Sequence, residues 1–406
     1  MELKPKILFI AVAIIFLFLS LLVGIFRLMA DNGLNTGILQ NIYALHSILM
    51  VFGFLACIVM AERVAGISVI PDLQQSRLPL AMVPLVALGV VSELAGYSMG
   101  PRWLDYVGGV LLLSGCFAFI FVLFKLSGKT GIKLPFYFMI LSAVSLSVSA
   151  ILSAFSLPAG NLPFIMLLLS FPLIFILGER VELTRFTSSA ASTNRFIISF
   201  ILASSAIALF TLSSALYFLF DLQMMILSIG SLLLLATLIV VLLTENQNLK
   251  LLSRSREPLQ RYVLTHTRVA YAWGIFGLIL AEIYFLSPGL DLYDPFIHSL
   301  AVGFIGTMLL AHGPVIIPSV IERKLDMTRI SLLPLEILTA GNLIRVVGDL
   351  IFSSHNSVIV NVSVGLSGWL ILIAVLVFLL KLIPLASSAN QTISSRKNSI
   401  TPKGSS

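Results

Sequence analysis

The sequence predicts an all-α, polytopic integral membrane protein: a bundle of about twelve transmembrane helices with both termini in the cytoplasm. Three observations lead to this prediction. The 406 residues are 58% hydrophobic and 11% charged, whereas a soluble domain carries roughly 25% charged residues. Several apolar runs exceed the ~20 residues that cross a hydrocarbon core. Lysines and arginines gather in alternate connections between these runs, as they do in membrane proteins of defined topology.

Twelve spans follow one another along the chain. The first, 7–29, is too long for the core of a signal peptide and lacks a small-residue cleavage site, so we expect a retained helix. The short alternating pattern of a membrane barrel strand is absent from the sequence. The other apolar runs are 39–60, 78–98, 103–126, 134–157, 161–179, 195–220, 222–244, 268–287, 293–317, 332–352 and 357–384.

The basic residues indicate the orientation. With the N-terminus inside, 22 of the 25 lysines and arginines fall in the N-terminus, the even-numbered connections or the C-terminus, and Arg27, Arg102 and Arg345 fall elsewhere. One missed or invented helix would scramble this asymmetry from that point on. We therefore expect a multi-pass protein of the cell membrane, with the lipid bilayer as a partner. The net charge of +7 has the same origin and does not indicate a nucleic-acid partner.

One membrane domain accounts for most of the chain. Residues 1–385 form the expected transmembrane domain, and the Ser-rich end, 386–406, is expected to be a disordered cytoplasmic tail. The longest connection, 244–267, is basic and polar, and we expect a solvated cytoplasmic loop there. Cys57 and Cys116 lie in apolar runs without a Cys-x-x-Cys pair, so neither a disulfide framework nor a thiolate metal site is expected.

Polar residues inside the spans gather at one predicted depth. The topology places His46 of the second span and His298 of the tenth in the outer half of the membrane. Such groups are costly in lipid and turn towards partners or a pathway. We expect a ligand or a pathway at this level; the alternative is that each residue only locks helices together. The same half holds Glu93, Glu282, Asn342, Arg345 and Asp349. The last three are spaced i, i+3, i+7 on one helix face, where Arg345 can pair with Asp349.

The other histidines are assigned differently. His312 lies fourteen residues beyond His298, about 21 Å along an ideal helix, so one compact metal site cannot use both. It precedes Gly313-Pro314, which kinks or ends the helix. His312 is therefore either structural or part of a second metal site. His266 and His355 are expected to be solvated.

A haem suits the two outer histidines. Imidazoles of His46 and His298 can ligate its iron from separate helices, while the macrocycle fills the apolar slot between them. Haem propionates are anionic, so Arg345 is the expected cofactor-binding cation, with Arg102 in an outer connection as a second. The sequence contains no His-x-x-x-His and no His-Glu-x-x-His, so a three-histidine copper or zinc site has little support.

These residues resemble the catalytic subunit of haem–copper oxidases, and more closely the NnrS-type membrane proteins that look like its relatives. In that subunit, a histidine followed by x-x-x-Met-x-Phe in the second of twelve helices binds the low-spin haem; here the stretch reads HSILMVF, with His46 and Met50. Its tenth helix carries His-x-His, and here that place reads Phe296-Ile297-His298. The low-spin ligand is kept and the high-spin position is Phe296. The copper ligands are missing too, since no histidine occurs between His46 and His266.

The resemblance covers the topology and these two helices. NnrS-type proteins also have twelve helices and a His-x-x-x-x-Gly helix, here His298 to Gly303, and they are associated with haem, copper and resistance to nitric oxide stress. The likeness implies a b-type haem in electron transfer or nitric-oxide-related metabolism, with no intact haem–copper centre. It also implies an electron-donor protein or a quinone as a partner. A copper cofactor is suggested only by this resemblance and by no motif in the sequence.

Two other functions remain open. A secondary transporter also has twelve helices with both ends inside, and Glu93, Glu282 and Asp349 would then be proton or ion sites. A non-catalytic membrane subunit, whose polar residues only lock helices, is the other. The stretches GERVEL at 178–183 and HGPVIIP at 312–318 look like signatures of a family subgroup without an assigned chemistry.

The second and tenth spans also echo each other. Each carries a His-Ser pair, at His46 and at His298, and is followed by a Glu-Arg pair. Each precedes a Leu-Pro-Leu, at 78–80 and at 333–335, that opens the next span. The spacings differ, so the echo is a hint of internal duplication and not a demonstrated repeat.

Overall fold

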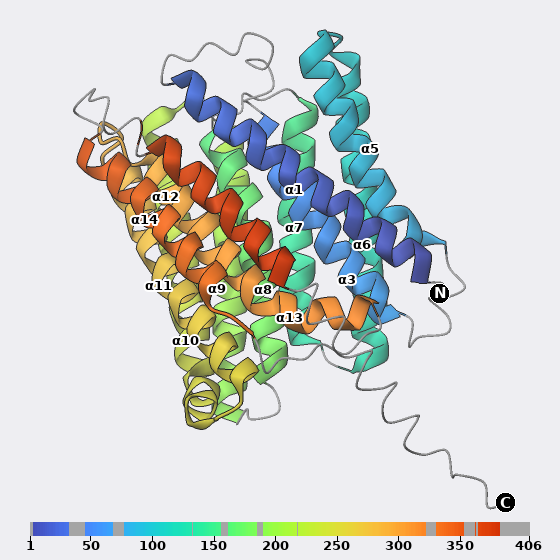
Figure 1. The fold of residues 1–406 in the computed structure, drawn as a ribbon. Coiled ribbons are helices and arrows are strands. Elements are labelled where there is room, and N and C mark those ends of the chain that lie inside the picture. The colour runs from blue at the N-terminus through green and yellow to red at the C-terminus, as the bar shows by residue number, and fades with distance from the viewer. Residues whose placement is uncertain are drawn as a thin grey trace, which may run out of the picture.

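The described chain is helical. The computed structural model describes residues 3–31, 45–67, 77–131, 133–155, 161–184, 190–216, 218–321, 330–352, 362 and 364–381, and no strand occurs within these ranges (Figure 1). The predicted all-α membrane bundle is confirmed. His355 and the tail proposed at 386–406 lie outside the described residues.

The expected spans coincide with helices. Eleven of the described helices are long and apolar enough to cross a membrane. α14 is also of spanning length but carries three charged residues, Glu336, Arg345 and Asp349. The second span is continuous through α2, η2 and α3, and the tenth through α12, η4 and α13. The helices are α1 (Leu3–Asp31), α2 (His46–Ile48), η2 (Leu49–Ala56), α3 (Cys57–Ile67), α5 (Leu78–Met99), α6 (Trp103–Thr130), α7 (Leu134–Ala154), α8 (Leu162–Thr184), α9 (Ala190–Ala215), α10 (Phe220–Arg254), α11 (Pro258–Leu286), α12 (Tyr293–His298), η4 (Ser299–Gly306), α13 (Thr307–Ile321), α14 (Leu333–Phe352) and a last span, Val364–Lys381.

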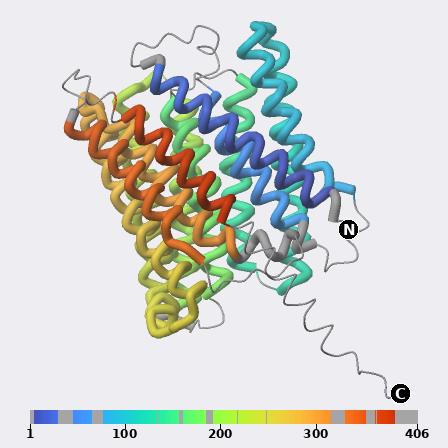
Figure 2. Tube along the Cα trace, viewed as in Figure 1, coloured from blue at the N-terminus to red at the C-terminus, as the bar shows by residue number. Residues whose placement is uncertain are grey.

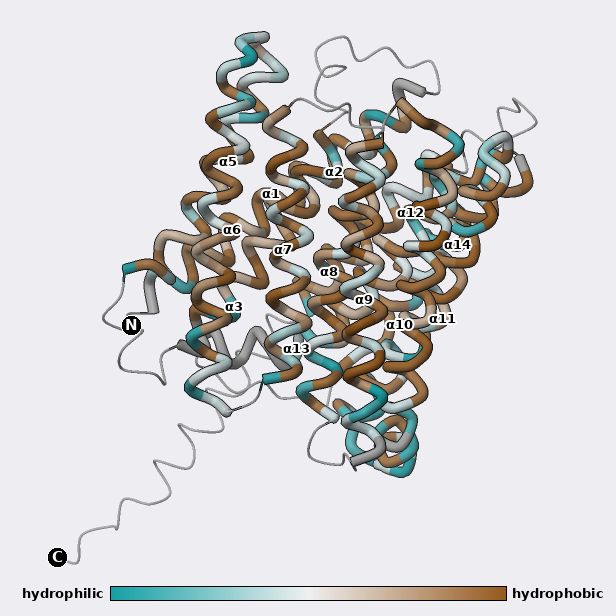
Figure 3. The backbone as a smooth tube through the Cα atoms, turned by 180° about the vertical axis from the view of Figure 1, so that it is seen from behind, coloured by the Kyte–Doolittle hydropathy of each residue, from teal (hydrophilic) through white to brown (hydrophobic). Residues whose placement is uncertain are grey.

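α8 lies inside the bundle. Its most apolar stretch is 94% buried in the protein, against 28–61% for the other spans. A helix that is apolar on all sides needs neighbours on all sides, and α8 contacts α7, α9, α10, η2 and η4. Other spans expose large apolar side chains, such as Phe124 and Ile201, as a lipid-facing surface requires. Figure 3 shows the polar residues concentrated towards the helix ends.

The second and tenth spans share an irregularity. Eight residues in each span, Leu49–Ala56 and Ser299–Gly306, are wound as π-helix. This form is rare in proteins, and where it occurs it is often at a functional site. Both stretches begin within three residues of the histidine, and each contains a fully buried phenylalanine, Phe52 or Phe304. The echo between the two spans therefore extends to their backbone geometry.

The first and last spans lie side by side. Leu17, Leu21 and Ile25 of α1 belong to one apolar cluster with Ile371 and Leu372 of the last span. Figure 2 shows these two helices, blue and red, across the front of the bundle. They close one side of the space between the second and tenth spans.

The prediction of a solvated loop at 244–267 is wrong. α10 continues to Arg254 and α11 begins at Pro258, so 255–257 alone separate two helices that project beyond the bundle as a hairpin (Figure 1). Leu, Lys, Arg, Glu and Gln favour helix whether or not water surrounds them, and proline suits the first helical position. His266, expected to be solvated, is fully buried because α11 packs against α13, where Tyr262 Oη donates to the Leu310 carbonyl at 3.0 Å.

Candidate functional site

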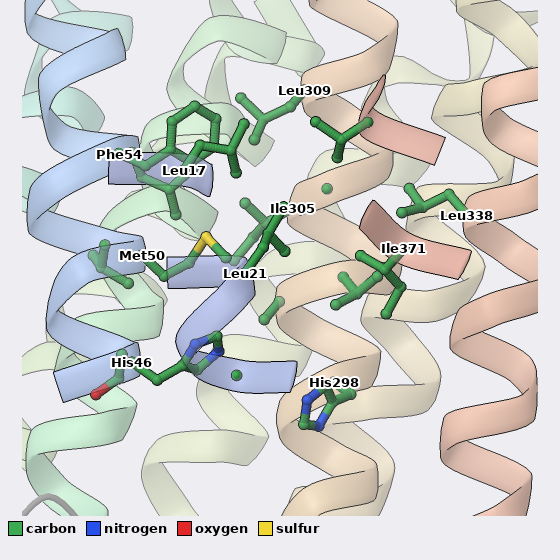
Figure 4. A pocket seen from close by; sticks show the side chains of 18 of the residues that line it. Leu17, Leu21, His46, Met50, Phe54, His298, Ile305, Leu309, Leu338 and Ile371 are labelled. Atoms are coloured by element: carbon green, nitrogen blue, oxygen red, sulfur yellow. The ribbon is translucent and has the colours of Figure 1, made fainter. Parts of the chain in front are cut away.

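A cavity of about 350 Å³ lies between α1, the second span, the tenth span, α14 and the last span (Figure 4). Ligand sites ordinarily measure about 300–1,000 Å³. Its wall is mostly aliphatic, with Leu21, Ile305, Leu338 and Ile371 among its residues. Most of its polar groups come from the predicted outer ends of the helices. These are Arg27, His46, Ser47, Tyr293, Asp294, His298 and Arg345.

His46 is fixed by α1. Its Nδ1 lies 2.8 Å from the Ser20 carbonyl oxygen, so Nδ1 carries the proton and donates it. The ring packs on Gly24, where an added Cβ would lie 2.8 Å from Cε1 of His46. Nε2 has no hydrogen-bond partner within the described part of the chain, and the ring borders the cavity (Figure 4). In this tautomer Nε2 is free to ligate a metal.

His298 is held in the same way on the other wall. Its Nδ1 lies 2.9 Å from the carbonyl oxygen of Asp294, one turn earlier in α12. No described residue gives its Nε2 a hydrogen bond. Figure 4 shows the His46 and His298 rings at one level, on two helices that border the same space. The structure therefore brings together the two histidines that the sequence analysis paired.

Arg345 joins this end of the cavity. Its side chain is buried, with Nη2 2.5 Å from Asp294 Oδ2 and Nε 3.0 Å from Asp349 Oδ2. The predicted pairing of Arg345 with Asp349 is confirmed. Nη1 is buried and has no hydrogen-bond partner among the described residues. Because Asp294 carries both the Arg345 contact and the His298 hydrogen bond, the cation and the imidazole are positioned by one residue.

The second cation of the cavity is Arg27. It lines the wall at the end of α1, whereas Arg102 lies at a separate pocket where α5 meets α6. The structure therefore does not place Arg102 in the histidine cavity, where a second propionate partner was expected. Arg27 and Arg102 are two of the three basic residues that fall outside the predicted cytoplasmic connections. Arg27 is the one at the cavity because α1 packs against the spans that carry the histidines.

The cavity continues well past the histidines. Its wall on α1 runs from Leu28 back to Ile10, about 27 Å at 1.5 Å per residue. Met50 lies in this wall one turn beyond His46, and Ser20 Oγ is 3.6 Å from its sulfur. At the far end the wall includes Glu62. The space is thus apolar over most of its length and polar at both ends.

Phe296 is part of a packed aromatic cluster. It is fully buried, with its ring 5.6 Å from Tyr284, 6.0 Å from Phe285 and 5.7 Å from Tyr293, measured between centroids. Aromatic packing of this kind stabilises the helix start without polar groups. The position that would carry a high-spin ligand by resemblance is thus filled by a packed aromatic cluster.

Glu93 and Glu282 lie outside the cavity. Glu93 accepts a hydrogen bond from Ser153 Oγ at 2.6 Å, between α5 and α7. Glu282 of α11 accepts from Ser228 Oγ and Ser231 Oγ of α10 at 2.6 and 2.7 Å. The common depth predicted for the polar residues therefore does not make them one site.

Asn342 and His312 also stand apart. Asn342 is fully buried on α14, and neither its Oδ1 nor its Nδ2 has a partner among the described residues. His312 hydrogen-bonds the backbone of Met308, and its Nε2 is buried without a partner in the described chain. Its neighbour Gly313 lines the cavity, but His312 does not. Within the described ranges, no three histidine, cysteine or acidic side chains form a group that could hold a metal ion.

A buried ionic cluster near the predicted cytoplasmic ends of the helices was not expected from the sequence. Arg63 Nη2 of α3 lies 2.8 Å from Glu179 Oε1 of α8. The next residue, Arg180, forms a fully buried ion pair with Glu245 of α10, and Tyr271 Oη donates to Glu245 at 2.7 Å. The GERVEL stretch thus has a structural role, because its charges tie α3, α8, α10 and α11 together. The Glu-Arg pair in an apolar helix could have indicated this cluster. However, Glu245, the partner of Arg180, lies in the stretch that was predicted to be a loop.

No curated protein matches the chain significantly. A family described as a domain of unknown function (DUF8744) matches residues 6–387, which include every helix of the bundle except the first residues of α1. The chain therefore belongs to the family of domains of unknown function DUF8744.

Proposed function

We propose that this protein is a haem-binding membrane protein in which His46 and His298 are the two axial ligands. One observation carries the proposal: both imidazoles line one apolar cavity, with Nδ1 bonded to a backbone carbonyl and Nε2 left for the iron. Such a bond from the other ring nitrogen fixes the tautomer and the orientation of a ligating histidine.

The residues present fit a non-covalently held, b-type haem. Aliphatic side chains suit the faces of a porphyrin, and Gly24 leaves room for the His46 ring against α1. Arg27 and the free Nη1 of Arg345 would meet the propionates at the polar end. Cys-x-x-Cys-His, the attachment motif of c-type haem, does not occur in the sequence. The proposal assigns no copper site.

Such a haem supplies reversible one-electron transfer. If His46 and His298 both bound the iron, no position would remain on it for a diatomic gas. We therefore infer an electron carrier, with nitric-oxide-related metabolism as the process that the resemblance suggests. The chain's own part is to hold both rings, neutralise the propionates and keep water from the iron with an aliphatic wall. A quinol or a small donor protein is the class of reductant that such a carrier requires.

An absorption spectrum of the detergent-purified protein, expressed with ample haem, tests the proposal. We expect a Soret band and a change in the visible bands on addition of dithionite. His46→Ala and His298→Ala should each lose most of the haem, whereas the matched control His266→Ala should keep it, since His266 is buried away from the cavity. A colourless wild-type protein contradicts the proposal and leaves the transporter interpretation, which counterflow in proteoliposomes would test.

A further inference from the structure

The hairpin formed by the end of α10 and the start of α11 is exposed and strongly basic. Its surface carries five cationic side chains, Lys250, Arg254, Arg256, Arg261 and Arg268. Between residues 246 and 268 the one acidic residue is Glu257, which is also exposed. Figure 3 shows hydrophilic residues along this hairpin, in contrast to the apolar spans. The hairpin lies on the predicted cytoplasmic side, and none of its cations lines the histidine cavity.

The described chain does not balance these charges. None of the five cations forms an ion pair or a ring contact with a described residue. The carboxylate that precedes the hairpin, Glu245, is fully buried and paired with Arg180 of α8. The hairpin therefore has an excess of positive charge on its surface, and such a surface attracts anionic partners.

The cations of α10 continue its lipid-facing stripe. Five apolar side chains on one face of this helix expose between 36% and 59% of their surface, namely Met225, Ile229, Leu232, Ile239 and Leu243. Lys250 and Arg254 follow Leu243 by seven and eleven residues, which are about two and three helical turns. Both cations therefore lie on the face of α10 that is turned to lipid.

α11 has the same arrangement. Ile279 and Leu286 expose 43% and 67% of their surface towards lipid. Arg261 precedes Ile279 by eighteen residues, and Arg268 precedes Leu286 by eighteen. Eighteen residues make five full turns at 3.6 residues per turn, so each arginine shares a face with its apolar counterpart. On both helices the side that faces lipid changes from apolar to basic.

The level of each cation follows from the antiparallel course of the hairpin. Residues equally far from the turn at 255–257 lie side by side, so Arg268 lies level with the end of the apolar stripe of α10 at Leu243. Lys250 and Arg261 lie about 10 Å further out, and Arg256 at the tip about 18 Å further out, at 1.5 Å per residue. The headgroup layer is about 5–8 Å thick on each side of the bilayer.

These levels separate two groups of cations. The long side chains of Arg268, Lys250 and Arg261 can reach the headgroup layer, because lysine and arginine extend along an apolar surface to place their charge at the interface. Arg256 lies beyond that layer by about one Debye length at physiological salt. The hairpin is therefore built to meet the membrane surface with its sides and water with its tip.

We propose that the α10–α11 hairpin binds anionic phospholipids of the cytoplasmic leaflet, with Lys250, Arg261 and Arg268 contacting their phosphate groups. A cluster of this size, immediately cytoplasmic to membrane spans, is typical of binding to anionic lipid. Guanidinium groups donate paired hydrogen bonds to phosphate oxygens, and the lysine ammonium adds a point charge. A soluble acidic protein would instead approach the tip at Arg256, whereas the other cations are turned to lipid.

Spin-labelled lipids test this site in the full-length protein. The protein is reconstituted in phosphatidylcholine bilayers with a trace of spin-labelled phosphatidylglycerol, and electron paramagnetic resonance separates the label held by the protein from the free label. At low salt we expect phosphatidylglycerol to be held more strongly than spin-labelled phosphatidylcholine. The preference should disappear at about 1 M salt, where the Debye length is about 3 Å.

Single substitutions show which cations take part. Lys250→Gln, Arg261→Gln and Arg268→Gln should each lower the affinity for phosphatidylglycerol by about fivefold, the factor that one basic residue contributes near an anionic surface. The matched control Arg256→Gln removes the same charge from the tip and should change the affinity by less than about twofold. Lys250→Arg keeps the charge and should keep the preference.

Two results would overturn the proposal. One is equal retention of the two labelled lipids by the wild type. The other is an equal loss in Arg256→Gln and Arg261→Gln, which would assign the hairpin to a soluble acidic partner. All the substituted side chains are exposed, and thermal unfolding confirms that each variant is folded. Haem content does not enter the measurement, so its outcome is independent of the haem proposal.

Discussion

Gly24→Ala should impair haem binding while leaving the fold intact. The added Cβ would lie 2.8 Å from Cε1 and 3.0 Å from Nδ1 of His46. Ordinary carbon–carbon contact begins at about 3.5 Å, so the ring has to retreat from α1 by roughly 0.7 Å. Ser20, which accepts the Nδ1 hydrogen bond at 2.8 Å, is on the same helix as Gly24. The retreat therefore stretches that bond beyond the ~3.2 Å at which such bonds are effective.

The two effects on stability nearly cancel. Losing the hydrogen bond costs about 0.5–1.5 kcal/mol, and alanine in place of glycine within a helix gains about 0.8–1.0 kcal/mol. Ligation does not benefit from this compensation, because a metal ligand has to stay within about 0.5 Å of its productive position. Loss of the partner that orients a ligating histidine typically lowers metal affinity by about 10–100-fold. We expect a haem affinity lowered within that range and a thermal midpoint close to that of the wild type.

Haem titration of the apoprotein, followed in the Soret region, measures the effect. Gly128→Ala is the matched control, because it makes the same substitution in α6 where an added Cβ meets nothing within 4 Å. It should bind haem as the wild type does. If Gly24→Ala and Gly128→Ala bind haem equally well, the contact between α1 and His46 does not position a ligand, and the reasoning fails.

Three further predictions test other parts of the structure. Glu245→Ala leaves Arg180 buried and unpaired, so it should lower stability by about 3–5 kcal/mol; chemical denaturation would measure this, and Arg180→Met together with Glu245→Leu should recover much of the loss. Arg345→Gln removes a positive charge next to the proposed propionates and should lower the haem reduction potential in a redox titration, while an unchanged or higher potential would contradict the placement. Leu338→Trp should reduce haem uptake by filling the cavity wall without altering either histidine, whereas full occupancy in this variant would place the haem elsewhere.

The membrane bundle could be predicted from the sequence because long apolar runs and alternating basic connections each depend on local composition alone. His46, His298 and Arg345 were found for a related reason, since an ionisable residue in an apolar helix is conspicuous. Depth alone could not show that Glu93 and Glu282 face other helices, because the rotation of each helix is set by long-range packing.

Other features left a weak signal or none. Glu245 begins a polar stretch whose composition is typical of a loop. In the structure α10 continues through this stretch, and the Glu245 carboxylate pairs with Arg180 of α8. The choice between Arg27 and Arg102 depends on which helices meet, which no local pattern encodes. The π-helical winding after His46 and His298 also has no periodicity of its own in so short a stretch. The shared His-Ser, Glu-Arg and Leu-Pro-Leu indicated a relation between the two spans but not this backbone geometry.

Electron paramagnetic resonance of the oxidised protein tests the central claim most directly, because it reports the axial ligands of the iron. Two imidazoles predict a low-spin ferric signal in the wild type, and His298→Ala should convert any haem that remains to a high-spin form. A high-spin wild-type signal, or a low-spin signal that survives in both His46→Ala and His298→Ala, would show that these two side chains are not the pair that holds the haem.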